Sequence, residues 1–198
     1  MPSFEEIRRA LAAHVPRVLP VSGARQAAVA VVLHEGRGDV EVLLIERARR
    51  EGDPWSGHMA FPGGRVDPGD PDPRRAAERE TLEEVGLELA SAEALSRLDD
   101  LEGTAAGTQS LLISAFVYHA PVRGPLALND EVTEALWVPL ETLLDPARHV
   151  AHPYPPGQQT MHFPGIVVGD PGRHVVWGLT YRFLERFFAV LGRRLPAR

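Results

Sequence analysis

The chain has 198 residues, of which 44% are hydrophobic and 24% are charged, and its formal net charge is −6. These values are typical of a globular protein and exclude a largely disordered chain, and no cluster of lysine and arginine indicates a nucleic-acid-binding face. Cysteine is absent, so disulfides and thiolate metal sites are excluded, and any bound metal must use oxygen or nitrogen ligands.

The first residues predict an amphipathic helix and not a targeting segment. Residues 3–14 fit such a helix, with Ser3 as its N-cap. The helix carries acidic residues where a signal peptide would be apolar, and no stretch reaches the roughly 18 apolar residues of a membrane span. We therefore expect a cytoplasmic protein without a membrane partner, in which residues 1–24 form an N-terminal helical extension.

Two strands and a second helix are predicted next. Apolar runs predict strands at 26–33 and 40–46, separated by a glycine-marked turn. A polar loop at 49–58 then leads into a short apolar segment. Asp72-Pro73 has the form of an N-cap followed by a proline in the first turn, so a helix is expected from there to Val85, just before Gly86.

The second half of the chain predicts more strands and a closing helix. Residues 95–103 are ambiguous, 110–120 and 134–140 predict strands, 145–165 predict a long ordered loop or irregular hairpin, and 174–191 predict a mostly apolar helix. This helix is also a candidate homodimer surface. Strands with few helices and no internal repeat predict an α+β fold in a single domain.

A short stretch, ERETLEEVGL at 78–87, crowds carboxylates together. On a helix, Glu80, Glu83 and Glu84 share one face, and like charges at this spacing cost roughly 0.2–0.5 kcal/mol per pair. One interpretation is a solvated acidic face. The other is a site for a hard divalent cation such as Mg²⁺, which would remove the repulsion. The spacing alone does not decide between them.

The residues upstream favour the cation site. FPGGRVDPGD, at 61–70, places Gly63 and Gly64 in a tight polar loop just before the helix. Glycine permits positive φ and close backbone approach, so the amides of such a loop can meet anionic oxygens. An acidic protein that handles phosphate in this loop would recruit it through a cation.

Together these segments resemble the Nudix hydrolase family, whose box is written G-x5-E-x7-R-E-U-x-E-E-x-G-U, where U is bulky and apolar. The matching residues are Gly64, Arg79, Glu80, Glu83, Glu84, Gly86 and Leu87. The resemblance implies an α/β/α sandwich with a mixed central sheet and a catalytic loop–helix–loop. It also implies metal-dependent hydrolysis of a pyrophosphate bond in a nucleoside diphosphate derivative.

The resemblance also implies roles for individual residues. Glu80 and Glu84 would be the primary Mg²⁺ or Mn²⁺ ligands, and Glu83 a ligand or a base that activates water. Arg79 would pair with a box carboxylate and orient it. Glu131 resembles the acid that many family members carry on a later loop, as a distal ligand or base. An ordinary surface glutamate is the alternative.

The box departs from the family pattern at three points. Asp70 stands where glutamate is expected, eight residues instead of seven separate it from Arg79, and Thr81 stands at an aliphatic position. Asp70 is therefore left between three roles, namely direct metal ligand, ligand through water, and support of the loop.

The longer box resembles the coenzyme A pyrophosphatase subgroup, as do residues 43–47, 57–64, 131–140 and 177–180, and the likeness covers about 25–190. It implies CoA or acyl-CoA as substrate, giving 3′,5′-ADP and (acyl)phosphopantetheine. The subgroup typically has an arginine where this chain has Asp53. The alternatives are ADP-ribose or dinucleotide cleavage, house-cleaning of damaged nucleotides, and a catalytically silent module that binds a nucleotide.

Several residues near the glycine loop are candidates for substrate contact. They are Arg47, Trp55, His58, Gly63 and Gly64. Trp55 is expected either to stack on a base or to pack its loop. The later histidines, such as His152 and His174, lack metal-site spacing and are read as structural or substrate-loop residues. Trp137 and Trp177 are expected in a core or an interface.

Overall fold

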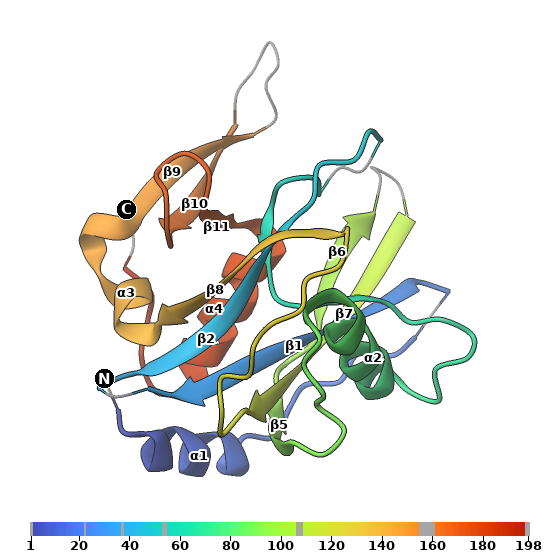
Figure 1. The fold of residues 1–198 in the computed structure, drawn as a ribbon, viewed down its shortest axis with the longest axis horizontal. Coiled ribbons are helices and arrows are strands. Elements are labelled where there is room, and N and C mark those ends of the chain that lie inside the picture. Colours follow the sequence, from blue (N-terminus) through green and yellow to red (C-terminus); the bar gives the residue numbers. More distant parts are fainter. Residues whose placement is uncertain are drawn as a thin grey trace.

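The computed structural model describes residues 2–21, 23–36, 38–52, 55–105, 109–154 and 161–196 (Figure 1). The elements follow one another in this order: α1 (Phe4–Ala13), β1 (Arg25–Glu35), β2 (Val40–Arg47), β3 (Met59–Ala60), β4 (Gly63–Arg65), α2 (Pro73–Val85), β5 (Glu93–Arg97), β6 (Leu101–Ala105), β7 (Gln109–His119), β8 (Val132–Pro139), α3 (Leu140–Leu144), the 3₁₀ turn η1 (Pro146–Arg148), β9 (His149–Tyr154), β10 (Met161–Val167), β11 (Val175–Trp177) and α4 (Gly178–Val190).

A mixed sheet forms the centre of the molecule. Strand β1 lies beside β7 in parallel, with Val29 opposite Ala115, and beside β2 and β4 in antiparallel fashion. Strands β3 and β8 add to β2, while β5 and β6 add to β7. The ambiguous segment 95–103 is thus part of β5, a connection and part of β6. The predicted mixed sheet is confirmed.

Helices cover both faces of this sheet, and Figure 1 shows α2 on the near side and α4 behind. Side chains alternate along β2, so Leu43 and Ile45 face α2 while Val42 and Leu44 face the other way. Helices α1, α3 and α4 pack on that second face. Burial on both faces explains why β2 reads as a continuous apolar run, and the expected α/β/α arrangement is confirmed.

Local capping fixes the first helix where it was expected. Ser3 accepts a hydrogen bond from the backbone of Glu6, and the Glu6 carboxylate accepts one from the backbone of Ser3, which makes a capping box.

Within the described part of the chain, no helix combines the length and apolar character needed to span a bilayer.

The C-terminal region agrees with the prediction in one part and differs from it in another. Residues 145–165, expected as a long ordered loop or irregular hairpin, contain β9 and most of β10, which pair in antiparallel fashion as the hairpin alternative predicts, and β11 joins them in a three-stranded sheet. The helix expected at 174–191 begins only at Gly178. The apolar run Val175–Trp177 suits a strand as well as a helix, and pairing with β10 together with a left-handed Gly178 (φ 63°) favours the strand.

Candidate metal and pyrophosphate site

Helix α2 begins and ends where local chemistry dictates. The Asp72 side chain accepts the backbone N–H of Arg75, Pro73 occupies the first turn, and Gly86 ends the helix in the left-handed region (φ 71°). Thr81, at the aliphatic position of the box, is fully buried. Its hydroxyl donates to the carbonyl of Ala77 at 2.7 Å, so burial leaves this polar group paired.

Arg79 joins the carboxylates on the outer side of this helix. Its Nη1 lies 3.0 Å from Glu80 Oε1 and 3.1 Å from Glu83 Oε2, and its Nη2 donates to the carbonyl of Arg65. One nitrogen therefore binds two of the crowded glutamates, and the positive charge of the Arg79 guanidinium offsets the repulsion between them. Arg79 therefore pairs with carboxylates of the box, and its role in orienting them stays a prediction.

Asp70 is held mainly by the same guanidinium. Its two oxygens accept from Nε and Nη2 of Arg79 at 3.1 and 3.0 Å, and Oδ2 also accepts the backbone N–H of Asp67. The hydrogen bonds from Arg79 hold the pKa of Asp70 below its usual range. Of the three roles left open, this pairing best supports Asp70 as a residue that fixes the loop against α2.

Glu84 is the buried member of the set, with 1% of its surface exposed. Its Oε2 accepts the backbone N–H of Gly63 at 2.8 Å, and Arg47 Nη1 lies 3.8 Å from its Oε1. Burial raises the pKa of Glu84 to about 7, against the opposing effects of the Gly63 hydrogen bond and the Arg47 charge. Burial also raises the pKa of Glu80. A buried carboxylate with so few partners has chemistry suited to a cation ligand.

The metal-free protein is expected to lose stability between about pH 4.5 and 7. Because the folded-state pKa of Glu84 lies above its unfolded value, the folded state binds more protons in this window, and the free energy of unfolding falls as pH rises. A shift of this size corresponds to about 3 kcal/mol. Urea titrations in EDTA at pH 5 and pH 7.5 measure it. Glu84→Gln should flatten the slope, and an equal slope in both proteins would contradict the assignment.

The two glycines bring the loop against α2. Gly63 has φ 146°, and a Cβ there would clash with the backbone of Ala28 and Val29 in β1. A Cβ on Gly64 would lie closer than 3.0 Å to the carboxylate of Glu80. Conformation and space thus require glycine at position 63, whereas a side chain at position 64 would displace the Glu80 carboxylate.

Glu131 approaches this face because its loop is tied to the end of α2. The backbone N–H groups of Ala127 and Asn129 donate to the carbonyls of Val85 and Glu84, which the helix cannot satisfy internally. The Glu131 charge contributes to the raised pKa values of both Glu80 and Glu84, so all three carboxylates share one electrostatic environment.

Arg50 holds Glu131 from the other side, a pairing that sequence reasoning missed. Its Nη1 donates to Glu131 Oε1 at 2.8 Å and its Nη2 to Asp130 at 3.0 Å, while Ala48 N–H donates to the Glu131 carbonyl. The Ser56 hydroxyl fixes the backbone of Arg50 through bonds to both its N–H and its carbonyl. No local sequence pattern predicts the contact between Arg50 and Glu131, because the two residues lie about eighty positions apart.

The remaining candidates lie around this face. Trp55 packs against the core on the α4 side, and His58 contacts Trp177 with ring centroids 4.6 Å apart. Trp137 packs against the core on the α2 side. Asp53, which stands in place of the subgroup arginine, lies outside the described residues.

A second acidic group lies on the other face of β2. Donor atoms of Glu46, Glu134 and His174 lie within 4.8 Å of one another, so the group is a possible cation site. Arg173 already fills it, with Nη2 at 2.6 Å from Glu46 and 2.9 Å from Glu134. His174 Nδ1 accepts the backbone N–H of Asp170, which leaves the ring proton on Nε2, the nitrogen that faces the carboxylates. A protonated nitrogen is not a ligand, and the group serves better as an ion network.

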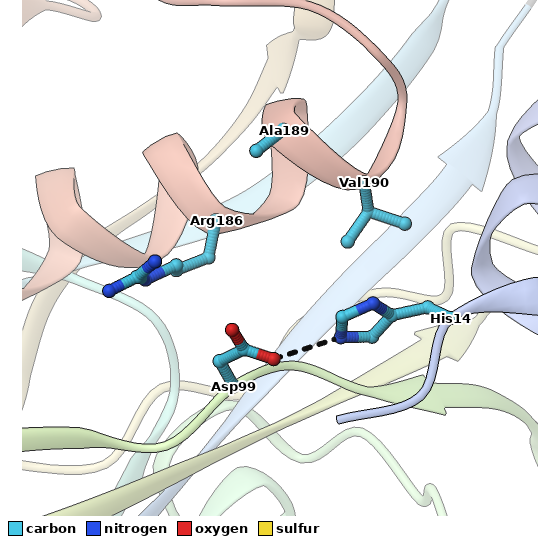
Figure 2. Close-up of a pocket in the computed structure, with 5 residues that line it drawn as sticks. All are labelled: His14, Asp99, Arg186, Ala189 and Val190. Carbon is cyan, nitrogen blue, oxygen red and sulfur yellow. Dashed lines mark ion pairs between the residues drawn. The ribbon is translucent and has the colours of Figure 1, made fainter. Parts of the chain in front are cut away.

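A hollow of about 210 Å³ lies on the α4 side of the central sheet, and Figure 2 shows the side chains that line it. His14 and Asp99 line one side of it, with His14 Nε2 3.2 Å from Asp99 Oδ1, and Arg186, Ala189 and Val190 of α4 line the other. It lies across the sheet from α2 and contains none of the box residues, so the chemistry suggested by the sequence has no place there.

The residues of the box fit a hard divalent cation. Glu80, Glu83 and Glu84 supply carboxylate oxygens, which Mg²⁺ and Mn²⁺ prefer, and Glu131 adds a fourth acid to the same environment. In the absence of a cation, Arg79 binds two of these glutamates, and Gly63 with Arg47 binds the third. The arrangement is a cluster of acidic residues beside the loop that contains the Gly63 N–H.

Comparisons with known proteins match the chain to one family. A model of the NUDIX domain matches residues 24–158. An uncharacterised protein of Schizosaccharomyces pombe is 38% identical over 157 residues, covering 69% of this chain and 48% of that protein. Nudix hydrolase 22, chloroplastic, of Arabidopsis thaliana is 29% identical over 180 residues, covering 87% of this chain and 57% of that protein.

A solved structure extends the likeness to three dimensions. The Ap4A hydrolase of Caenorhabditis elegans, in a binary complex, has a TM-score of 0.51 and 25% sequence identity, covering 59% of this chain and 81% of that one. The chain spans about half the length of the curated relatives it matches.

Proposed function

The chain belongs to the NUDIX family, and from this premise we propose that it is a divalent-metal-dependent pyrophosphohydrolase acting on nucleoside diphosphate derivatives. The observation that carries the proposal is the buried Glu84, which accepts the Gly63 N–H and shares its surroundings with Glu80 and Glu131. A silent binding module has no need of a buried carboxylate with a pKa near 7 beside two other acids.

In this proposal Glu80, Glu83 and Glu84 hold Mg²⁺ or Mn²⁺. The cation, when bound, supplies positive charge against the pyrophosphate oxygens and makes a water more acidic. Arg79 orients Glu80 and Glu83 and ties them to Asp70, so their oxygens stay on one side of α2. Gly63 orients Glu84 through its N–H, and the lack of a side chain on Gly64 leaves room for the Glu80 carboxylate.

Proton transfer is proposed for a carboxylate at the edge of the site. Glu83 is half-exposed and Glu131 is also accessible, so either can accept a proton from water without a large desolvation cost. Arg50 orients Glu131 at 2.8 Å, and Arg79 orients Glu83 at 3.1 Å. Arg47, beside Glu84, is placed to contact an anionic oxygen of the substrate.

For the substrate, we propose CoA or acyl-CoA as the first candidate, on the subgroup resemblance of residues 43–47, 57–64 and 131–140. Dinucleotide or ADP-ribose cleavage is the rival. The likeness to an Ap4A hydrolase favours it, as does Asp53, which leaves the expected coenzyme phosphate contact without its arginine. The single domain, the cytoplasmic location and the homodimer through α4 stay predictions.

One experiment separates these functions. The protein is incubated with Mg²⁺ or Mn²⁺ and, separately, CoA, acyl-CoA, ADP-ribose, NADH, diadenosine polyphosphates and nucleoside triphosphates, and the products are resolved chromatographically. Release of 3′,5′-ADP from CoA alone supports the first candidate, and cleavage of diadenosine polyphosphates or ADP-ribose supports the rival. EDTA should abolish either reaction. No turnover of any compound would replace the hydrolase by a binding module.

A further inference from the structure

Three half-buried aromatic rings surround Trp177, itself half-buried, at the junction of β11 and α4. His152 of β9 stacks on Trp177, with ring centroids 4.9 Å apart and planes inclined by 30°. His58 meets Trp177 nearly edge-on at 4.6 Å, and Phe163 of β10 lies at 5.9 Å. We call His58, His152, Phe163 and Trp177 the Trp177 cluster. Each ring retains partial exposure, whereas the phenylalanines of α4 are fully buried.

The Trp177 cluster is connected to Glu84 of α2 through β2 and the residue before β3. The backbone N–H of Arg47 donates to the carbonyl of His58 at 3.1 Å, so these residues are cross-strand neighbours. Neighbours of this kind share a face of the sheet, and Ala60, two residues after His58, packs on the α2 face. Arg47 itself lies 3.8 Å from Glu84. His58 therefore joins the cluster to the place proposed for the pyrophosphate.

An ion network fixes the cluster in this position. Arg173 and His174 directly precede β11, and Arg173 binds Glu46 through Nε and Nη2 and Glu134 through Nη2. Glu46 is the residue before Arg47. Two consecutive residues at one end of β2 thus bind the segment before β11 and reach Glu84, so the two sites keep a fixed separation.

The composition of the cluster suits a flat heteroaromatic ligand better than a closed core. Two of its four rings are imidazoles, which combine a planar face with polar edges. Burial lowers the pKa of His152, which favours its neutral ring. Stacking on aromatic rings binds nucleobases with little dependence on sequence, because every base has a π-face, and polar edges nearby can meet its ring nitrogens.

We propose that the Trp177 cluster binds the base of the nucleotide substrate, beside the pyrophosphate site. This inference rests on the proposed function and adds the recognised substrate class to it, a pyrophosphate that carries a heteroaromatic base. Trp177, expected from the sequence as a core or interface residue, becomes a specificity residue. Loss of one stacking ring corresponds to a roughly five- to 150-fold loss of affinity.

Binding of AMP without metal tests the proposal without any turnover. Equilibrium dialysis compares the full chain with Trp177→Leu, which removes the ring, and Trp177→Phe, which keeps one. Trp137→Leu is the matched control, since Trp137 is a half-buried tryptophan of β8 outside the cluster. Ribose 5-phosphate serves as the baseless probe. We expect Trp177→Leu alone to weaken AMP binding by the stated factor and to leave ribose 5-phosphate binding unchanged.

A second pair of variants covers the case in which Trp177→Leu does not fold. His152→Leu should weaken AMP binding, whereas His162→Leu, at an exposed position of β10, should not. Wild-type protein that does not bind AMP, or His152→Leu and Trp177→Leu that bind it normally, would overturn the proposal. Trp177-dependent AMP binding without hydrolysis of any substrate would overturn the proposed function and keep the base site. Hydrolysis with an unaltered KM in Trp177→Leu would overturn the base site and keep the proposed function.

Discussion

Replacement of Glu84 by glutamine is expected to lower kcat/KM by about 10²–10⁴-fold while the fold stays intact. Glutamine fills the same space, and its carbonyl oxygen can still accept the Gly63 N–H, so the loop keeps its contact with α2. What is lost is the negative charge in a buried place, which is the property a cation ligand needs. Steady-state kinetics with Mg²⁺ and isothermal titration of Mn²⁺ measure the two effects.

A matched control for this variant lies just beyond the helix. Glu88→Gln removes one carboxylate from an exposed position and should leave kcat/KM and Mn²⁺ affinity unchanged. Glu83→Gln provides a useful comparison, because Glu83 is half-exposed and bound to Arg79 at 3.1 Å. It too should lower turnover by orders of magnitude. Near-full activity of Glu84→Gln would remove this residue from the metal site.

Gly64→Ala is expected to abolish metal binding and to destabilise the fold much less than Gly63→Ala. The new methyl group would lie closer than 3.0 Å to the Glu80 carboxylate, which must then move away from its place beside Arg79. We expect a loss of activity of about 10²-fold or more, since small displacements of positioned groups have effects of this size. Activity and Mn²⁺ titration measure the loss, and thermal unfolding in EDTA measures the remaining stability.

The same loop supplies the control. A Cβ on Gly69 meets nothing within 4 Å, and its backbone is outside the left-handed region, so Gly69→Ala should behave as the wild type. Gly63→Ala should differ from both. Its clash is with the backbone of β1, and destabilisation by several kcal/mol is expected, at the upper end of strain and overpacking costs of about 1–3 kcal/mol each. If Gly64→Ala bound Mn²⁺ normally, Glu80 would not be a ligand.

The parts of the molecule that the sequence predicts well are those set by neighbours in the chain. Asp72 and Gly86 mark the ends of α2 because a cap acts on residues within one turn. Ser3 does the same for α1. The crowding of Glu80, Glu83 and Glu84 is likewise local, so the sequence is enough to bring them to one face of a helix.

The parts that the sequence does not predict depend on distant pairing. Val175–Trp177 suits either regular structure, and only pairing with β10 makes it a strand. Arg50 reads as an ordinary surface charge until the loop before β8 places Glu131 against it. The doubt over Asp70 has the same origin, because the partner that holds it, Arg79, also binds the glutamates.

The parallel pairing of β1 with β7 places contacts between distant residues at the centre of the sheet. Arg25 lies opposite Leu111, and the segment that contains the box lies between them in the chain. Contacts between such distant residues carry a large loop-closure entropy and make folding slow. The hydrogen bond from the Asn129 N–H to the Glu84 carbonyl also joins residues that lie far apart in the chain. A peptide of residues 61–87 would therefore carry every box residue and yet lack the burial of Glu84 on which the proposed metal site depends.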